Sequence, residues 1–360
     1  MGRERKTAGR SPFSAHPLFC LLPVVFIATS FAAEPTKLRL SVNEPLTVQL
    51  ALGLGAFAQE GLEIEIVKVE SVAKEDYLIQ RPLVEGKLDA SFHWFQHVVF
   101  GARHHLPLKA VMMIADTPNL TIVVANRVKD QIKSAADFKG RNIAEGVGYA
   151  TKSLITNYLA HRAGLPRDSY TAVLKESDGR REAVLKGLAE DRVDVLSFME
   201  PMTSAILDTK KVTVLYDLAT RAGTVKAFGA PWPSHSVFLS AAFIAKNPDT
   251  VQRLVNALVR ARRFAESHTP EEIAARLPPS FFANGDRAAA LDRIRQTRSG
   301  YAHGNYAFTP DAVKLVADAI LWSKFDSSEE GIFRAGGDKS VRYADLYDNR
   351  FVEKAMKEIK

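Results

Sequence analysis

The sequence predicts an α/β protein with two lobes and a helical C-terminal tail. Short segments that alternate apolar and polar residues take turns with helical segments from residue 37 onward, which is the pattern of βαβ units and a largely parallel sheet. This pattern starts again near residue 121, and a length of 360 residues is sufficient for two lobes. From Asp249 onward the periodicity becomes mostly helical, and this part forms the tail.

The composition favours a globular protein and restricts the function classes. Hydrophobic residues make up 46% and charged residues 25% of the chain, so it is neither disordered nor fibrous. The one cysteine, Cys20, excludes a disulfide framework and a zinc site built mainly from cysteines. The net charge of +7 would by itself favour nucleic acid or an anionic membrane as partner.

The N-terminus changes that interpretation because residues 1–32 have the pattern of a secretory signal. A basic start is followed by an apolar run over 18–28 and small residues before a predicted cleavage after Ala32. The run is too short to span a membrane, which takes about 20 apolar residues. Cleavage removes four positive charges and one negative charge, so +7 becomes +4, and it also removes Cys20. The mature protein is therefore expected to be periplasmic and cysteine-free, with no nucleic-acid partner.

In the first lobe, predicted strands and helices alternate from residue 37 to residue 115. Glycines Gly61 and Gly86 follow two of the helices, as C-terminal stop signals do. The pattern predicts strands over 37–43, 62–69, 88–92 and 109–115, and helices over 46–59, 74–84 and 98–105.

The second lobe repeats this organisation, and two segments resemble each other. Residues 84–91 and 189–196 both pass from a helix end through a polar turn to an apolar residue and an aspartate that enter a strand. Strands are predicted over 121–125, 142–145, 172–175, 193–198 and 212–216, and helices over 134–140, 151–163, 179–188 and after Pro201.

The remaining chain returns to the first lobe and ends in the helical tail. A strand is predicted over 237–244, followed by helices over 251–267, 270–276, 286–297 and 310–325. The tail is expected to pack on one lobe. The crossings between lobes are expected near 125–128 and 223–229, which gives a first lobe of 33–125 plus 229–360 and a second lobe of 126–228.

The glycine-rich turn over 146–153 follows a strand and opens a helix. It is not a Walker A loop, because Thr151 stands where the glycine before Lys-Ser is required. Such a turn at a helix N-terminus still presents N–H groups to an anion, with the Thr151 hydroxyl and the Lys152 charge beside them. A simple helix cap is the alternative interpretation.

Two histidines four residues apart, His93 and His97, follow another strand. A zinc protease of this spacing would need glutamate at Trp94, so that class is excluded and no metal site is predicted. Ligands of open α/β sheets bind outside the carboxyl ends of strands, which favours His93 and Trp94 as ligand contacts. Further candidate residues follow other strands: Asn43, Glu44, Asp116, Thr117, Ser177, Asp178, Met199 and Glu200. Trp232 either stacks on a ligand or fills the junction of the lobes.

Several segments, in this order and spacing, are typical of one family. They are 52–64, 86–90, 137–143, the turn over 146–153, 193–195, Glu200-Pro201 and 241–250. Over nearly all of the mature chain, the sequence resembles the periplasmic solute-binding proteins of nitrate/sulfonate/bicarbonate (taurine-type) ABC importers. The resemblance implies a periplasmic binding protein fold of type II, with two α/β lobes that close on a ligand about two crossings.

The resemblance also implies a ligand-binding site between the lobes. His93 and Trp94 stand where small residues are common in the family, which favours an organic ligand larger than nitrate. Glu44 and Glu200 would suit an amine or hydroxyl group on that ligand. The predicted ligand-binding residues are Asn43, Glu44, His93, Trp94, Tyr149, Ala150, Thr151, Glu200 and Trp232.

The predicted function is capture of a small organic anion, of sulfonate or carboxylate type, for delivery to an ABC permease and its ATPase. The protein is expected to be a monomer without a cofactor, a metal or catalytic residues. The alternative is an enzyme on the same fold, similar to pyrimidine-synthesis or aromatic decarboxylase proteins, in which the histidines perform acid–base chemistry. The secretory signal argues against that alternative.

Overall fold

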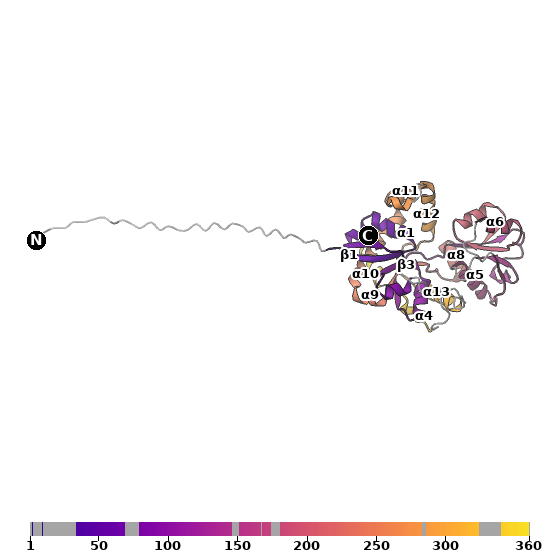
Figure 1. Ribbon diagram of the computed structural model, residues 1–360, viewed down its shortest axis with the longest axis horizontal. Coiled ribbons are helices and arrows are strands. Elements are labelled where there is room, and N and C mark those ends of the chain that lie inside the picture. The colour runs from indigo at the N-terminus through magenta and orange to yellow at the C-terminus, as the bar shows by residue number, and fades with distance from the viewer. Residues whose placement is uncertain are drawn as a thin grey trace. The chain divides into compact units, whose positions relative to one another are not determined.

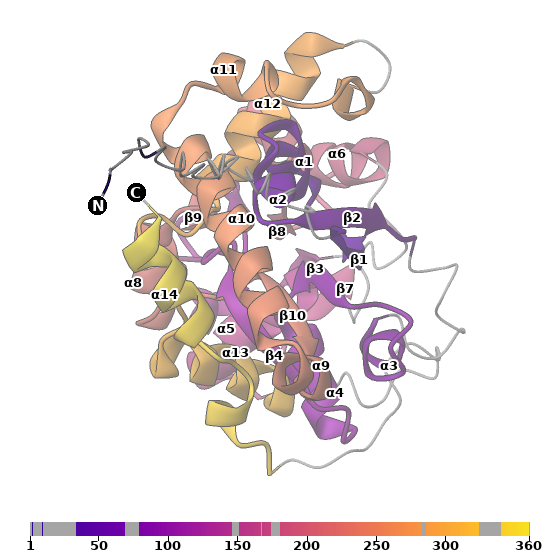
Figure 2. The same ribbon diagram turned by 90° about the vertical axis from the view of Figure 1, so that its left-hand side faces the viewer.

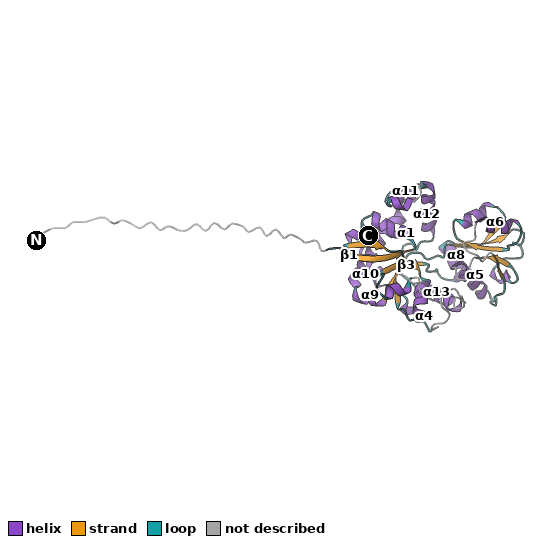
Figure 3. Cartoon of the chain, in the orientation of Figure 1, coloured by secondary structure: helices purple, strands orange, loops and turns teal. Residues whose placement is uncertain are grey.

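The computed structural model describes residues 34–68, 79–145, 151–166, 168–173, 181–282, 286–323 and 340–359, together with Gly2 and Gly9. The chain divides into two units, Met1–Glu34 and Pro35–Lys360. Apart from the two isolated glycines, the predicted signal lies outside the described residues. The larger unit contains two separate five-stranded sheets with helices packed around each (Figures 1 and 3).

The first sheet has the strand order β2-β1-β3-β10-β4. Strand β1 pairs in parallel with β2 and β3, whereas β10 runs antiparallel to β3 and β4. The strands are β1 (Thr36–Val42), β2 (Leu62–Ile66), β3 (Ala90–Trp94), β4 (Leu108–Met113) and β10 (His235–Ser240). The helices between them are α1 (Pro45–Gly53), α2 (Ala56–Gln59), α3 (Gln80–Val84) and α4 (Gln96–Arg103).

The second sheet has the strand order β7-β6-β8-β5-β9, and β5 is its one antiparallel member. Its strands are β5 (Leu120–Ala125), β6 (Asn142–Ala144), β7 (Thr171–Val173), β8 (Val195–Phe198) and β9 (Val212–Leu218). Its helices are the 3₁₀ turn η2 (Ala135–Phe138), α5 (Thr151–Arg162), α6 (Arg181–Ala189), α7 (Met202–Asp208) and α8 (Arg221–Phe228).

The two antiparallel strands, β5 and β10, are each the first strand after the chain passes from one sheet to the other. Residues 114–119 join β4 of the first sheet to β5 of the second. The chain passes between the sheets there, earlier than the expected crossing near 125–128, because strand 120–125 already pairs in the second sheet.

The end of β10 also differs from the prediction. We expected a strand over 237–244, but the strand stops at Ser240, whose hydroxyl accepts a hydrogen bond from the backbone of Phe243 at 3.2 Å. This contact caps α9 (Ala241–Lys246). The apolar composition of this segment predicts that the strand continues, but the serine N-cap starts a helix there instead. The predicted helix over 74–84 is described only from Gln80 onward.

The resemblance between residues 84–91 and 189–196 has a physical basis, first in Asp89. Its carboxylate accepts hydrogen bonds from the Arg39 backbone N–H (2.7 Å), Nε (3.0 Å) and Nη2 (2.8 Å). Arg39 Nη2 also donates to the carbonyl of Gly86 at 2.7 Å, in a turn where Gly86 has a φ of 70°. Asp89 therefore fixes strand β1 and the turn before β3 together.

Asp194 does the same in the second sheet. It accepts hydrogen bonds from the backbone of Asn142 in β6 at 2.8 Å and from Arg127 Nη2 at 2.7 Å. Arg127 Nη2 donates to the carbonyl of Asp191 at 2.9 Å, and Asp191 has a φ of 57°. Both sheets thus use one aspartate and one arginine to align a parallel strand with the preceding turn.

The helical tail contacts helices of both sheets rather than one lobe alone. Helix α10 packs on α1, α2 and α14, and Figure 2 shows α10 beside α14. Helix α13 packs against α4 and also against α5 of the second sheet, where the ring of Trp322 stacks on His161 at 4.4 Å. The tail helices are α10 (Pro248–Ser267), α11 (Pro270–Ala274), α12 (Arg287–Ser299), α13 (Pro310–Trp322) and α14 (Arg350–Glu358).

The described part of the chain contains no helix that is long and apolar enough to cross a membrane.

Candidate ligand-binding site

The carboxyl end of β3 and the beginning of β10 bring an aromatic cluster together. These strands are antiparallel, and their register places His235 opposite Trp94 and Ser236 opposite His93. Because an antiparallel strand starts where its neighbour ends, His235 joins the two residues predicted from the sequence. His235 itself was not predicted, although the rigid Pro-Trp-Pro-Ser segment before it leads into this strand.

On one face of the sheet, His235 connects two predicted residues. Its ring lies 4.1 Å from the ring of Trp94, and its Nε2 is hydrogen-bonded to Asn43 Oδ1 at 3.1 Å. Asn43 is exposed at the end of β1, and its backbone N–H donates to the carbonyl of Phe92 at 2.9 Å. The structure therefore places Asn43, Trp94 and His235 side by side at the carboxyl edge of the first sheet.

On the other face, His93 meets His97 of helix α4. The two rings form a T-shaped pair at 4.4 Å, and His97 Nδ1 is hydrogen-bonded to Gln80 Nε2 at 3.2 Å. His93 Nδ1 accepts a hydrogen bond from the backbone N–H of Trp94 at 2.9 Å. A backbone N–H can only donate, so the neutral His93 ring carries its hydrogen on Nε2.

These three imidazoles are neutral at pH 7. Burial lowers the pKa of His93 to about 4. Burial and then the proximity of His93 lower the pKa of His235 to about 3. The pKa of His97 lies well below its ordinary value for the same reasons, burial first. This edge of the sheet thus offers aromatic surface and uncharged hydrogen-bonding groups, with the Nε2–H of His93 as a donor that bonds to no described residue.

Glu44 has a different role from the one predicted for a ligand contact. Its side chain is 6% exposed and caps helix α1, because it accepts hydrogen bonds from the backbones of Leu46 at 2.9 Å and Thr47 at 3.2 Å. The hydroxyl of Tyr301 donates a further hydrogen bond to it at 3.1 Å. All of these bonds satisfy the carboxylate within the protein.

Trp232 is also buried, with 2% exposure, and its ring packs on Phe228 at 5.1 Å. Its backbone N–H donates to the carbonyl of Asp116 at 2.8 Å. Of the two interpretations of this tryptophan, the structure favours the one in which it fills the junction where the chain returns from the second sheet to the first.

At the edge of the second sheet, Thr151 begins helix α5. Its hydroxyl donates to Gln96 Oε1 at 3.4 Å, and Gln96 is the first residue of α4. The next residue, Lys152, holds its ammonium 4.8 Å from the ring centre of Phe198, at the end of β8. The predicted residues Tyr149 and Ala150 lie outside the described residues, as do Ser177 and Asp178.

Two glutamates lie close to this edge. Glu200 is half-buried after β8 and accepts a hydrogen bond from the backbone of Ser204 at 3.2 Å. Glu145, which the sequence analysis missed, is buried at the end of β6 and accepts hydrogen bonds from Tyr170 at 2.7 Å and Asn157 at 3.3 Å. Burial and the negative charge of Glu145 raise the pKa of Tyr170 far above its ordinary value, so its hydroxyl stays protonated. Glu145 anchors the segment that leads into the glycine-rich turn.

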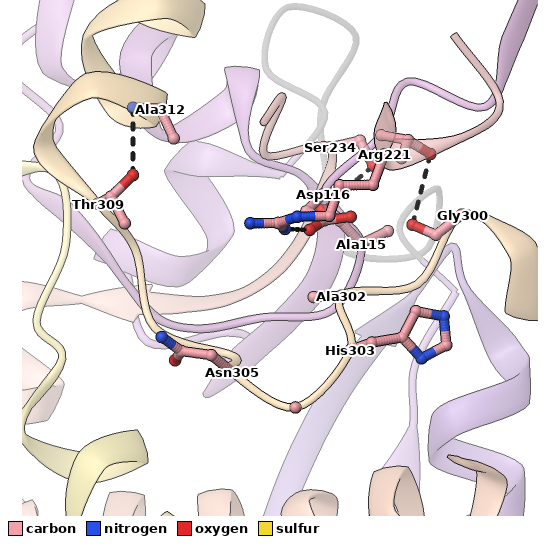
Figure 4. A network of polar contacts seen from close by, with 12 residues as sticks. Ala115, Asp116, Arg221, Ser234, Gly300, Ala302, His303, Asn305, Thr309 and Ala312 are labelled. Carbon is pink, nitrogen blue, oxygen red and sulfur yellow. Dashed lines mark hydrogen bonds and ion pairs between the residues drawn. The ribbon is translucent and has the colours of Figure 1, made fainter. Parts of the chain in front are cut away.

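The predicted candidates Asp116 and Thr117 lie in the chain crossing from β4 to β5. The fully buried carboxylate of Asp116 forms an ion pair with Arg221, at the start of α8 (Figure 4). The Thr117 hydroxyl lies within 3.4 Å of the carbonyl of Ala219 and 3.5 Å of that of Gly300. These contacts make the crossing a packed polar junction rather than a free loop.

Among the residues that the structure describes, no group of three or more histidine, cysteine, aspartate or glutamate side chains is arranged to hold a metal ion.

Several solved structures share this fold. The periplasmic sulfonate-binding protein SsuA from Methylobacillus flagellatus KT, of a putative sulfonate ABC transporter, is 16% identical, with a TM-score of 0.65 over 91% of this chain and 95% of that one. The periplasmic nitrate-binding protein NrtA from Synechocystis PCC 6803 is 12% identical, with a TM-score of 0.57 over 91% and 90% of the two chains. The desulfurization enzyme DSZB is 15% identical, with a TM-score of 0.56 over 90% and 100%.

These likenesses establish the periplasmic binding protein fold that the sequence predicts. No curated protein sequence matches the chain. The sequence model of the NMT1/THI5-like family matches residues 46–273, which is more than half of the chain. This chain therefore belongs to the NMT1/THI5-like family.

Proposed function

We propose that this protein is the periplasmic solute-binding component of an ABC importer. It captures a small organic anion, of sulfonate or carboxylate type, between two lobes and delivers it to a membrane permease that works with an ATPase. The predicted signal over 1–32 supports export, and the fold shared with sulfonate- and nitrate-binding proteins supports solute capture. We also propose that the protein acts as a monomer, whose single chain supplies both sheets.

The observation that carries the proposal is the meeting of two helix N-termini from the two sheets. Gln96 begins α4 after β3 of the first sheet, and Thr151 begins α5 after β6 of the second. Their side chains are hydrogen-bonded at 3.4 Å. The unpaired N–H groups and positive dipole ends of helix N-termini favour an anion, and Lys152 adds a positive charge on the second side.

The first sheet adds the part of the site that favours an organic ligand. Strand β3, which carries His93 and Trp94, ends just before Gln96, and His235 packs on Trp94; both imidazoles are uncharged at neutral pH. Aromatic rings favour carbon-bearing groups, and the Nε2–H of His93 can donate to an oxygen of the ligand. We therefore propose an organic anion rather than an inorganic one.

Closure brings the two lobes onto the ligand. The first lobe comprises residues 34–113 with the chain from 235 onward, and the second comprises residues 120–218 with α8. Residues 114–119 and 229–234 connect them and would absorb the change in backbone angles.

Isothermal titration of the exported protein with alkanesulfonates, carboxylates of matched length and nitrate tests this proposal. MOPS, taurine and their carboxylate counterparts serve as probes. We expect at least one organic anion to bind more tightly than nitrate. We expect Thr151→Val to weaken binding about tenfold, since it removes a hydroxyl at the anion. Thr213→Val, whose hydroxyl bonds to Asn126 in the second sheet, is the matched control and should bind like the unchanged protein. Absence of binding across the series would refute the proposal.

An enzyme remains the second candidate because DSZB, an enzyme, shares the fold and because His93, His97 and His235 lie together. Acid–base catalysis by an imidazole requires a pKa near the operating pH, and burial moves the pKa of His93 and His235 well below it. Incubation of each bound probe with the protein, followed by NMR, separates the candidates. Unchanged probe supports solute binding, whereas turnover that is lost in His93→Ala supports the enzyme.

A further inference from the structure

Tyr301 lies in the tail segment between α12 and α13, yet it reaches the turn that leads out of strand β1. We infer that Tyr301 is a positioning residue, which fixes the turn over 43–47 of the ligand-binding site and ties it to the crossing between the lobes. This inference rests on the proposed function as far as ligand affinity is concerned. Its structural part stands on the contacts alone.

The phenol hydroxyl of Tyr301 is part of an ordered chain of hydrogen bonds. It lies 3.1 Å from Glu44 Oε1 and 3.1 Å from Thr47 Oγ1. A carboxylate can only accept, so Tyr301 donates to Glu44 and the Thr47 hydroxyl donates to Tyr301. Tyr301 and Thr47 are 3% and 1% exposed, so a missing partner here would leave a buried polar group unsatisfied.

Glu44 transmits this contact to the turn. The carboxylate oxygen that accepts from Tyr301 also accepts from the backbone of Leu46 at 2.9 Å, while its other oxygen accepts from Thr47 at 3.2 Å. Asn43 directly precedes Glu44 and bonds to His235 of the aromatic cluster. The position of Asn43 therefore depends on a cap that Tyr301 helps to hold.

Arg262 of helix α10 holds Tyr301 from the other side. Its guanidinium lies 3.5 Å from the centre of the Tyr301 ring, and its Nη2 donates to the carbonyl of Ala302 at 2.8 Å. The side chain of Arg262 is fully buried. The positive guanidinium of Arg262 thus contacts the ring of Tyr301, while the negative carboxylate of Glu44 contacts its hydroxyl. Tyr301 lies between two buried charges of opposite sign.

The backbone around Tyr301 is paired with the crossing. The N–H of Ala302 donates to the carbonyl of Ile114 at 3.0 Å, and the N–H of Asp116 donates to the carbonyl of Gly300 at 3.3 Å. On its other side, the same crossing receives a hydrogen bond from the N–H of Ser234 to Ala115 at 2.9 Å (Figure 4). The tail segment around Tyr301 thus pairs with one segment that connects the lobes, 114–119, which in turn pairs with the other, 229–234. The tail is therefore a third backbone segment at the crossing.

These contacts join three parts of the molecule that are distant in sequence. Tyr301, 257 positions after Glu44, holds the ligand-side turn through its hydroxyl. Its two neighbours, Gly300 and Ala302, hold the crossing through backbone hydrogen bonds. Removal of the hydroxyl alone is expected to loosen the turn while the backbone pairing persists.

Tyr301→Phe in the full exported protein tests the inference, and Tyr306→Phe is the matched control. Tyr306 is also fully buried beside Arg262, at 5.5 Å, but its hydroxyl donates to Glu266 at 2.8 Å rather than to Glu44. Hydrogen exchange of the amides of Leu46 and Thr47 reports the turn without any ligand. Titration with MOPS, or with whichever probe of the series binds most tightly, reports affinity.

We expect Tyr301→Phe to speed exchange of the two amides about tenfold and to weaken probe binding about five- to tenfold. Tyr306→Phe should change neither, even where both variants lower the melting temperature. Equal effects of the two variants, unchanged exchange in Tyr301→Phe, or faster exchange with unchanged affinity would overturn the inference. If no probe binds the unchanged protein, the proposed function fails, while the exchange measurement still decides whether Tyr301 holds the turn.

Discussion

Between pH 7 and pH 5, His235 is expected to lower the free energy of unfolding by about 2 kcal/mol. Replacing His235 with glutamine should abolish this part of the loss. Burial, and secondarily His93, lower the pKa of His235 from 6.5 to about 3. The folded protein therefore keeps this imidazole neutral at pH 5, whereas the unfolded chain binds a proton there. The stabilising contribution is complete above pH 6.5 and is lost as the pH falls from 6.5 towards 3.

The magnitude follows from the two pKa values. One pH unit below the pKa of the unfolded residue costs about 1.4 kcal/mol. The interval from pH 6.5 to pH 5 spans about 1.5 pH units, which gives about 2 kcal/mol. His93, with a pKa of about 4, contributes about 2 kcal/mol more over the same range. His97 acts in the same direction, because its pKa is also lowered.

Urea denaturation followed by circular dichroism at pH 7, 6 and 5 measures this effect. His235→Gln also loses the ring contact with Trp94, so its stability is expected to fall at every pH, but its decline with acid should be shallower. His105→Gln, at an exposed histidine, is the control and should leave the pH dependence as it is. If His235→Gln destabilises with acid as steeply as the unchanged protein, the burial argument is wrong.

Three further changes are expected to lower stability at neutral pH. Gly53→Ala places a Cβ onto the backbone carbonyl of Arg276, so the backbone must shift; we expect a loss of about 2 kcal/mol in urea denaturation, whereas Leu52→Ala at the exposed neighbour should cost much less. Asp89→Asn removes the charge that accepts three hydrogen bonds from one arginine and should cost about 2–3 kcal/mol. Asp194→Asn should cost a similar amount, and a negligible loss in both variants would contradict the shared role of the two aspartates.

Local sequence patterns were sufficient for most of the fold. Alternation and glycine stops located most strands and helices of both sheets, although α8 was not predicted and the start of α9 was predicted as strand. The resemblance between 84–91 and 189–196 corresponds to the same aspartate–arginine arrangement. Membership of a sheet was not predictable in this way. All six residues of strand 120–125 are buried, and their pattern does not show which sheet the strand joins.

The candidate site was predicted in part, for a similar reason. His93 and Trp94 are the last two residues of β3, and the strand predicted over 88–92 already placed them at its carboxyl end. His235 joins them through antiparallel pairing across the return crossing, a long-range contact that no local pattern encodes. The capping role of Glu44 was not predicted, although the proline after it is typical of the first helical position.

Closure of the two lobes on an organic anion is the central claim, and a distance across the lobes tests it most directly. The only cysteine of the chain, Cys20, lies in the predicted signal, so the exported protein accepts spin labels at engineered cysteines alone. Glu65→Cys in β2 and Lys186→Cys in α6 place labels at exposed positions, one in each lobe. Pulsed electron–electron double resonance should show a change in their distance on addition of the tightest-binding organic anion. At a concentration near the Kd of the unchanged protein, Thr151→Val should show a smaller fraction of molecules with the changed distance. An unchanged distance with a bound anion would contradict the account.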